Sequence, residues 1–141
     1  MVLETTYHNK KDEILINDLV GKSFTFWQIL KLKGIGSKRM IVNTVSTNMK
    51  EYINKVADIT YANIELRPKG ILVLINKGLR NFTWVIPYYQ LVIYKSDGFS
   101  IHAQGKFVSF KEDRLFKENK KFINKLLTLR IAFLNKLFEL S

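Results

Sequence analysis

Four basic side chains flank a glycine-containing turn and offer the clearest chemistry that the sequence holds. They are Lys31, Lys33, Lys38 and Arg39. No Asp or Glu occurs between Asp18 and Glu51, so no acid close in sequence neutralises these charges. Gly34 and Gly36 leave backbone N–H groups open to the approach of a phosphate. The segment 31–39 therefore predicts a basic hairpin that binds an anionic ligand. The alternative is a lysine-rich edge that only prevents aggregation.

Signatures of catalysis and metal binding are weak. The chain contains no cysteine and two histidines, which removes thiolate nucleophiles and cysteine-ligated metals. Neither His8 nor His102 stands in a spacing relation to a pair of carboxylates. The glycines and the lysine of segment 34–38 do not have the spacing of a phosphate-binding P-loop. We therefore expect no enzyme activity and name no catalytic residue, metal ligand or cofactor.

A second group of basic residues alternates with aromatic residues in the middle of the chain. It comprises Arg67, Lys69, Lys77, Arg80, Phe82, Trp84, Tyr88 and Tyr89. Bases stack on aromatic rings and phosphates pair with cations, so this mixture suits single-stranded nucleic acid. Aromatic residues on strands are also typical of a core, and the consensus of an RNA-recognition sheet is absent. Nucleic acid is therefore a less favoured partner.

Composition predicts one basic globular domain. The 141 residues carry a formal net charge of +11 and are 47% hydrophobic, which suits a single domain over residues 1–141. The charge favours acidic partners such as nucleic acid, an anionic membrane surface or an acidic protein. Residues 1–12 lack the sections of a secretory signal, and lysines or arginines interrupt every apolar run. We expect a cytoplasmic protein.

The elements that must position these residues begin with a sheet. Residues 59–111 consist of short runs rich in Val, Ile, Phe, Tyr and Trp. Turn signals separate these runs at 68–70, 76–78, 87, 96–98 and 104–105. Ile71 to Ile75 is apolar at every position, which predicts a strand covered on both faces. Phe82, Trp84 and Ile86 predict a strand buried on one face. The stretch predicts an antiparallel sheet.

The first part of the chain mixes two periodicities. Alternation over 22–32 predicts a strand with a bulge near Trp27, and 38–42 predicts the strand that returns from it. Spacing of three and four residues over 43–58 predicts one inserted helix of about three turns. Residues 11–20, which end at a glycine, predict one or two helical turns, with a strand at 14–16 as the alternative. Residues 1–9 are either an edge strand or a partly ordered arm.

The last segment, 113–140, predicts a long helix with a wide apolar face. Its apolar positions are Leu115, Phe122, Ile123, Leu126, Leu127, Leu129, Phe133, Leu134, Leu137 and Phe138. A helix of this length would run for about 40 Å, which exceeds the span of one small sheet. Its surplus apolar surface predicts a homodimer contact through Leu126, Leu134, Leu137 and Phe138. The alternative is a bent or broken helix that packs within its own chain.

Two stretches resemble pleckstrin-homology-like (PH-like) domains. The first stretch begins with Trp84-Val85-Ile86-Pro87-Tyr88 and continues with a strand, a hairpin and a terminal helix. This succession is similar to that of the bacterial PH-like domains, in which an Ile-Pro-aromatic motif precedes the same elements. Residues 29–34 and 37–42 resemble the first hairpin of a PH domain. The resemblance implies a binding module and, as in the phosphoinositide-binding members, phosphate contacts by Lys31, Lys33, Lys38 and Arg39. The helix expected at 46–58 departs from the standard succession.

The sequence thus predicts an α+β fold: an antiparallel sheet or sandwich of about seven strands, PH-like, with one inserted helix and a long C-terminal helix. We expect a noncatalytic binding or assembly module that engages a protein partner or itself. The alternative function is anionic-ligand binding, of a membrane headgroup or a nucleic acid, through the basic hairpin 31–39.

Overall fold

The computed structural model describes residues 1–55, 58–96 and 98–140. Its centre is an antiparallel eight-stranded sheet in the order β1-β5-β4-β3-β2-β8-β7-β6. The strands are β1 Val2–Glu4, β2 Met40–Val45, β3 Tyr61–Arg67, β4 Gly70–Lys77, β5 Arg80–Pro87, β6 Val92–Tyr94, β7 Phe99–Ala103 and β8 Lys106–Phe110. Together with the helices, the sheet confirms the predicted α+β class.

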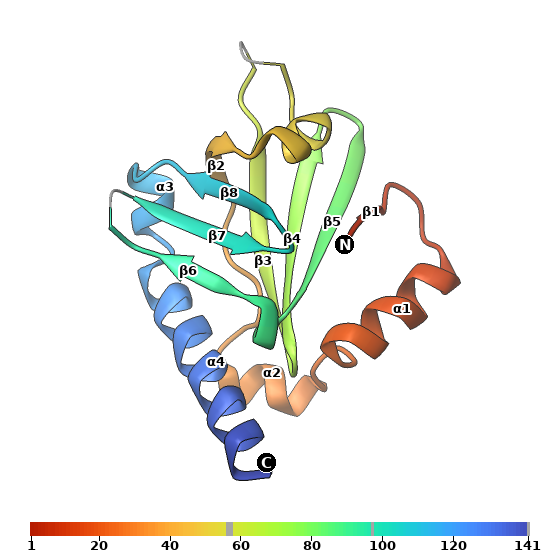
Figure 1. Cartoon of the computed structure of the whole chain (residues 1–141), viewed down its shortest axis with the longest axis vertical. Helices are drawn as coiled ribbons and strands as arrows, with labels where there is room; N and C mark the ends of the chain where they lie inside the picture. The colour runs from red at the N-terminus through yellow and green to blue at the C-terminus, as the bar shows by residue number, and fades with distance from the viewer. Residues whose placement is uncertain (56–57, 97, 141) are drawn as a thin grey trace.

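The sheet bends where β2 passes from β3 to β8. The register of β2 against β8 shifts between Val42 and Val45, and an irregularity of this kind bends a strand and increases its twist. Strands β6 to β8 consequently run at a steep angle to β3, β4 and β5, and they overlap β3 in the view of Figure 1. The space between the two halves of the sheet holds the main core, which includes Trp84, Phe99, Phe110 and Met40, each at most 2% exposed.

Four α-helices and two short 3₁₀ helices surround the sheet. They are α1 Lys10–Val20, α2 Phe26–Leu32, α3 Arg114–Lys117, α4 Lys120–Leu140, η1 Thr47–Tyr52 and η2 Tyr88–Gln90. The predicted helix at 11–20 is confirmed, because Asn9 caps its start and Gly21, at φ +86°, ends it. The long C-terminal helix is also confirmed, although it is broken after α3.

Helix α1 covers the outer face of β4 and β5. Its Ile16 and Val20 pack with Leu72 and Val85 in a second, smaller cluster. The prediction that Ile71 to Ile75 is covered on both faces is therefore confirmed for most of the strand. The prediction of one-sided burial for β5 is wrong, because Thr83 on its other face is also buried and accepts or donates a 2.7 Å hydrogen bond to Thr5.

The predicted strand at 22–32 is wrong, since residues 26–32 form helix α2. Thr25 and Gln28 form a reciprocal capping box: the Gln28 N–H donates to Thr25 Oγ1 at 3.3 Å, and the Thr25 N–H donates to Gln28 Oε1 at 2.9 Å. This local signal prevails over the alternation of apolar residues. Without a strand at 22–32 there is no hairpin at 31–39. The returning strand, β2, begins only at Met40.

The predicted three-turn helix at 43–58 is also wrong. Residues 43–45 complete β2, and the helical part is the 3₁₀ helix η1 from Thr47 to Tyr52. Val56 and Ala57, on which part of the prediction rested, lie outside the described residues. Met49 of η1 is fully buried, so the short element still covers one end of the core.

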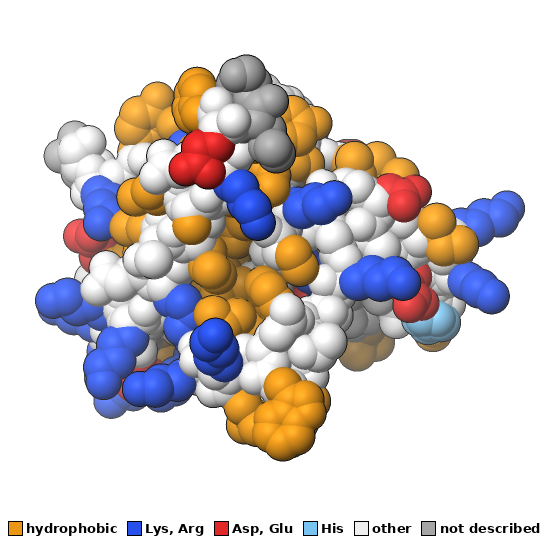
Figure 2. Space-filling view, turned by 90° about the horizontal axis from the view of Figure 1, so that it is seen from below, with side chains coloured by type: hydrophobic (Ala, Val, Ile, Leu, Met, Phe, Trp, Pro, Cys, Tyr) orange, Lys and Arg blue, Asp and Glu red, His pale blue; other side chains and the backbone are white. Residues whose placement is uncertain are grey.

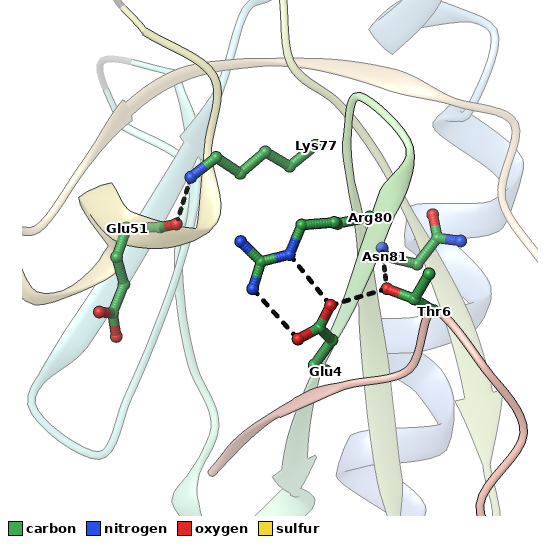
Figure 3. A network of polar contacts seen from close by, with 6 residues as sticks. All are labelled: Glu4, Thr6, Glu51, Lys77, Arg80 and Asn81. Carbon is green, nitrogen blue, oxygen red and sulfur yellow. Dashed lines mark hydrogen bonds and ion pairs between the residues drawn. The ribbon is translucent and has the colours of Figure 1, made fainter.

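Polar contacts fasten the chain start and η1 to the hairpin between β4 and β5 (Figure 3). The Arg80 guanidinium donates to both carboxylate oxygens of Glu4, at 3.0 and 3.1 Å. Lys77 donates to the backbone carbonyl of Glu51 at 2.7 Å. Residues 1–9 thus include an edge strand, β1, paired with β5. At this end of the sheet, Arg80 and Lys77 are therefore both bonded to residues of other elements.

Candidate functional site

The break between α3 and α4 is fixed by a buried asparagine. Asn119 is 2% exposed. Its Oδ1 accepts from the Lys38 N–H at 2.8 Å, and its Nδ2 donates to the carbonyls of Lys38 at 3.2 Å and Leu115 at 3.1 Å. These bonds tie the start of α4 to the segment before β2. The direction in which α4 leaves the sheet is therefore set by a side chain that the sequence analysis did not single out.

The first half of α4 is core. Phe122, Ile123 and Leu126 are buried among the residues of the main cluster. Just beyond this half, Phe133 packs its ring 5.5 Å from that of Tyr88. Leu126 is fully buried within its own chain, so it is not available for the homodimer contact that we predicted for it. This half of the helix packs as the alternative prediction described.

The second half of α4 projects along the lower end of the molecule (Figure 1). Ile131, Leu137 and Phe138 are 56%, 42% and 77% exposed, and Leu134 is half-buried. Arg130 secures this part of the helix, because its Nε and Nη2 donate to the Leu91 carbonyl at 3.2 and 2.9 Å. Three of the four predicted interface residues therefore lie on a projecting but anchored helix.

Helix α2 presents its own apolar side chains at the same end. Phe26, Trp27 and Leu30 are 68%, 77% and 54% exposed, and the two rings meet edge to face at 5.8 Å. Sequence reasoning missed this feature, because the alternation pattern assigned Phe26 and Leu30 to the buried face of a strand. The Thr25–Gln28 capping box was the signal that identifies a helix here.

A lysine of α4 holds α2 in place. Lys125 Nζ donates to the carbonyl oxygens of Gly34 at 2.8 Å and Lys33 at 3.3 Å, which lie just beyond the last turn of α2. Burial, and to a lesser extent the nearby charge of Lys33, lowers the pKa of Lys125. Helix α2 and helix α4 are therefore neighbours. We refer to the exposed apolar side chains of both, Phe26, Trp27, Leu30, Ile131, Leu137 and Phe138, as the apolar end.

The four predicted phosphate contacts do not form one hairpin site. Lys31 and Lys33 belong to α2 and its end, are exposed, and have no ion pair within the described part of the chain. Lys38 lies 4.0 Å from the Glu118 carboxylate. The Arg39 guanidinium stacks on the ring of Tyr61 at 4.3 Å. Lys31 and Lys33 thus lie next to the apolar side chains of α2, whereas Lys38 contacts Glu118 and Arg39 contacts Tyr61.

Basic residues dominate the sequence on both helices of the apolar end. Segment 19–50 contains no acid, and α4 contains none before Glu139. The basic side chains on these segments are Lys22, Lys31, Lys33, Lys38, Arg39, Lys50, Lys120, Lys121, Lys125, Arg130 and Lys136. Figure 2 shows this end directly, with apolar side chains across its middle and lower edge and lysine or arginine side chains on both sides.

Two open clefts lie on the sheet, away from the apolar end. One, of about 840 Å³, is bordered by residues of α1, β4 and β5. Its Arg67 donates to Glu65 at 2.8 Å and to Asn17 at 3.1 Å. The other, of about 580 Å³, lies over β7 and β8. There His102 bonds to Ser100 at 2.9 Å and stacks on Phe107. Burial lowers the pKa of His102.

Two further clefts lie beside β2 and beside the start of α4. The first, of about 770 Å³, is bordered by β2 and the residues after η1. The second, of about 350 Å³, is bordered by Phe99, Phe116 and Ile123. Neither these two clefts nor the two on the sheet are lined by residues of the apolar end. The side chains of the apolar end are instead exposed at the surface.

Comparisons with family models, with curated proteins and with solved structures found no match for this chain. Among residues 1–55, 58–96 and 98–140, no helix is both long and apolar enough to span a membrane. The same residues contain no group of three or more His, Asp or Glu side chains placed to hold a metal ion.

Proposed function

We propose that this protein is a noncatalytic binding module, and that it docks through its apolar end onto a partner with both apolar groups and negative charge. The observation that carries the proposal is the exposure of Phe26 and Trp27, at 68% and 77%, on a helix that is capped and bonded to the rest of the fold. Clusters of exposed large apolar side chains mark interaction sites on soluble proteins.

Rigid anchoring distinguishes the apolar end from a frayed segment. A loose segment exposes apolar side chains because it has no packing partner, whereas α2 is held at both ends. Its start has the capping box of Thr25 and Gln28, and its end receives the ammonium of Lys125. A surface held in one conformation loses little conformational entropy on binding, which favours affinity.

The charge of this end selects the partner. Lys31 and Lys33 have no carboxylate partner among the described residues, and a second copy of the chain would bring the same lysines against them. Like charges facing each other across an interface are unfavourable. An anionic partner is therefore favoured over the homodimer that the sequence first suggested. The predicted anionic-ligand function thus moves from a hairpin to the apolar end.

The succession of elements supports a place for the protein among PH-like binding domains. From β2 to β8, seven antiparallel strands follow one another and a helix closes the sheet, which is the architecture that the resemblance implies. Strand β1, helix α1 and helix α2 are additions to it. Because PH-like domains serve mainly as binding modules, this resemblance favours the same functional class as the apolar end does.

An acidic amphipathic peptide tests the proposed function without assuming a natural partner. We expect a helical peptide with leucines on one face and glutamates on the other to bind the protein, as measured by fluorescence anisotropy. Trp27→Ser combined with Leu137→Ser should reduce the affinity at least about tenfold, since each removes apolar contact area. Leu79→Ser is the matched control, because Leu79 is 96% exposed on the β4–β5 turn.

Sedimentation equilibrium completes this test. A chain that stays monomeric and binds the peptide only with an intact apolar end supports the proposal. A concentration-dependent dimer abolished by Trp27→Ser and Leu137→Ser would contradict it in favour of self-assembly. Equal affinity in the double variant and in Leu79→Ser would show that the peptide binds elsewhere, and would also contradict the proposal.

A further inference from the structure

We infer that the partner of the apolar end is the surface of a lipid bilayer rich in anionic headgroups, into which Phe26 and Trp27 insert. This inference rests on the proposed function and adds the identity of the partner. Three features of the described residues carry it: the projecting shape of the apolar end, its residue types and the position of its lysines.

The shape of the apolar end suits a bilayer better than a peptide. A protein that captures an amphipathic helix normally does so in a groove, and none of the four clefts described above is lined by Phe26, Trp27 or Leu30. Helix α2 instead holds these side chains outward, each more than half exposed. A projecting apolar helix can enter the soft boundary between headgroups and acyl chains, which adapts to its shape.

The residue types of α2 are those of an interfacial helix. Tryptophan and phenylalanine are favoured where the polar headgroups meet the hydrocarbon, and α2 places one of each at its start. The helix has seven residues, Phe26–Leu32, and at 1.5 Å per residue it is about 10 Å long. An element of this length can lie in the plane of the interface but cannot cross the membrane.

Lysines next to the apolar side chains supply the attraction to anionic lipid. Lys31 lies within α2 and Lys33 at its end, and both are exposed. Long lysine side chains can lie along an apolar surface and keep the ammonium at headgroup level. Each lysine close to an anionic surface strengthens binding by roughly fivefold. Helix α4, which is bonded to the end of α2 through Lys125, exposes further apolar side chains, Ile131 and Leu137.

Co-sedimentation with vesicles tests the inference on the full chain. We expect retention on vesicles of phosphatidylcholine and phosphatidylglycerol at about 150 mM salt, and little retention on phosphatidylcholine alone. Phe26→Ser with Trp27→Ser should weaken binding at least about tenfold. Lys31→Gln with Lys33→Gln should weaken it roughly twenty-five-fold. Circular dichroism and the melting temperature should match those of the unchanged protein, because all four side chains are exposed.

Two control variants match these changes at other places on the surface. Leu79→Ser removes an apolar side chain that is 96% exposed on the β4–β5 turn. Lys10→Gln with Lys11→Gln removes the same number of charges from the start of α1, where both lysines are exposed. We expect neither control to change vesicle binding by more than about twofold. If net charge alone drove the binding, the two lysine-pair variants would instead bind the vesicles with equally reduced affinity.

Tryptophan fluorescence reports the depth of insertion. The two tryptophans of the chain differ, since Trp27 is 77% exposed and Trp84 is fully buried. Vesicles that contain phosphatidylglycerol should shift the emission of Trp27 to shorter wavelength, and brominated acyl chains should quench it. Emission that vesicles leave unchanged while the protein co-sediments would show that α2 stays outside the interface, which would overturn insertion.

The experiments separate failure of the inference from failure of the proposed function. Binding of the acidic amphipathic peptide without binding of anionic vesicles would overturn the lipid inference but would still support the proposed binding function. If the protein bound neither the peptide nor the vesicles, the lipid inference and the proposed function would both be overturned. Vesicle binding that Phe26→Ser with Trp27→Ser leaves unchanged would also overturn the lipid inference, because the contact would then be made by another surface.

Discussion

The two halves of helix α4 resemble each other in composition but differ in surroundings. In the first half Phe122, Ile123 and Leu126 are buried in the main core. In the second half Ile131 and Leu137 are 56% and 42% exposed, although the helix continues without a break. One apolar stripe thus serves as core where the sheet lies beneath it and as open surface where the sheet has ended.

Apolar periodicity alone therefore does not distinguish the buried part of a helix from its exposed part. What separates them is the length of the sheet, because the part of α4 that extends past it has little to cover. At the opposite end of the sheet, Arg80 is paired with Glu4 and Lys77 with a backbone carbonyl (Figure 3). At the apolar end Lys31 and Lys33 have no such ion pairs among the described residues.

The largest expected effect concerns a leucine of the first half. Leu126→Ala should lower the free energy of unfolding by about 2–5 kcal/mol, because the side chain is fully buried and its removal leaves a cavity. Leu137→Ala is the matched change in the second half and should alter it by less than about 0.5 kcal/mol. Urea unfolding of both variants measures the difference. If both variants lost the same free energy of unfolding, the two halves of α4 would contribute equally to the core, which would contradict this account.

The next effect concerns the asparagine that sets the direction of α4. Asn119→Ala should lower the free energy of unfolding by about 1–3 kcal/mol, because the buried Asn119 side chain accepts from the Lys38 N–H and donates to two carbonyls, and the change removes these bonds. Asn124→Ala, at an exposed position of the same helix, is the control. Urea unfolding should show a loss only for Asn119. A negligible loss would mean that packing of Phe122 and Ile123 alone directs the helix.

A smaller effect concerns the link between α4 and α2. Lys125→Met should lower the free energy of unfolding by about 0.5–1.5 kcal/mol, since Lys125 donates to the carbonyls of Gly34 and Lys33. It should also weaken vesicle binding, because α2 would be less firmly held. Lys121→Met, one turn earlier and exposed, removes the same charge without these bonds. Equal vesicle binding by the two variants would contradict a positioning role for Lys125.

The smallest effect concerns pH. Burial lowers the pKa of His102 in the folded protein, so the unfolded chain takes up its proton first as the pH falls. Stability from this group is complete above its ordinary pKa of about 6.5 and decreases below it, until the pH reaches the folded value. The His102→Gln variant should lose this decrease in urea unfolding measured at several pH values. An unchanged slope would assign the decrease to another group.

The sequence predicted the fold class well because its strongest signals were local and repeated. Turn signals at 68–70, 76–78 and 104–105 do separate consecutive strands, whereas Asp97 in the turn at 96–98 lies outside the described residues. The prediction of a strand at 22–32 was wrong because the apolar residues there fit both a strand and a helical spacing. The capping box of Thr25 and Gln28 stabilises the helix.

The candidate site was only partly predictable. The sequence singled out Leu137 and Phe138 of the apolar end by their surplus apolar surface, and Lys31 and Lys33 by local charge. Their common location could not be read from the sequence, because it depends on where the sheet ends and on the bond from Lys125 to the end of α2. Burial of Leu126 depends on the same tertiary arrangement.

The central claim is that the apolar end binds and does not support the fold. Its most direct test measures unfolding in urea and vesicle co-sedimentation together for one variant, Trp27→Ser with Leu137→Ser. We predict a free energy of unfolding within about 0.5 kcal/mol of the unchanged protein and loss of binding to phosphatidylglycerol vesicles. A loss of stability as large as that of Leu126→Ala, with binding that follows the folded fraction, would contradict the claim.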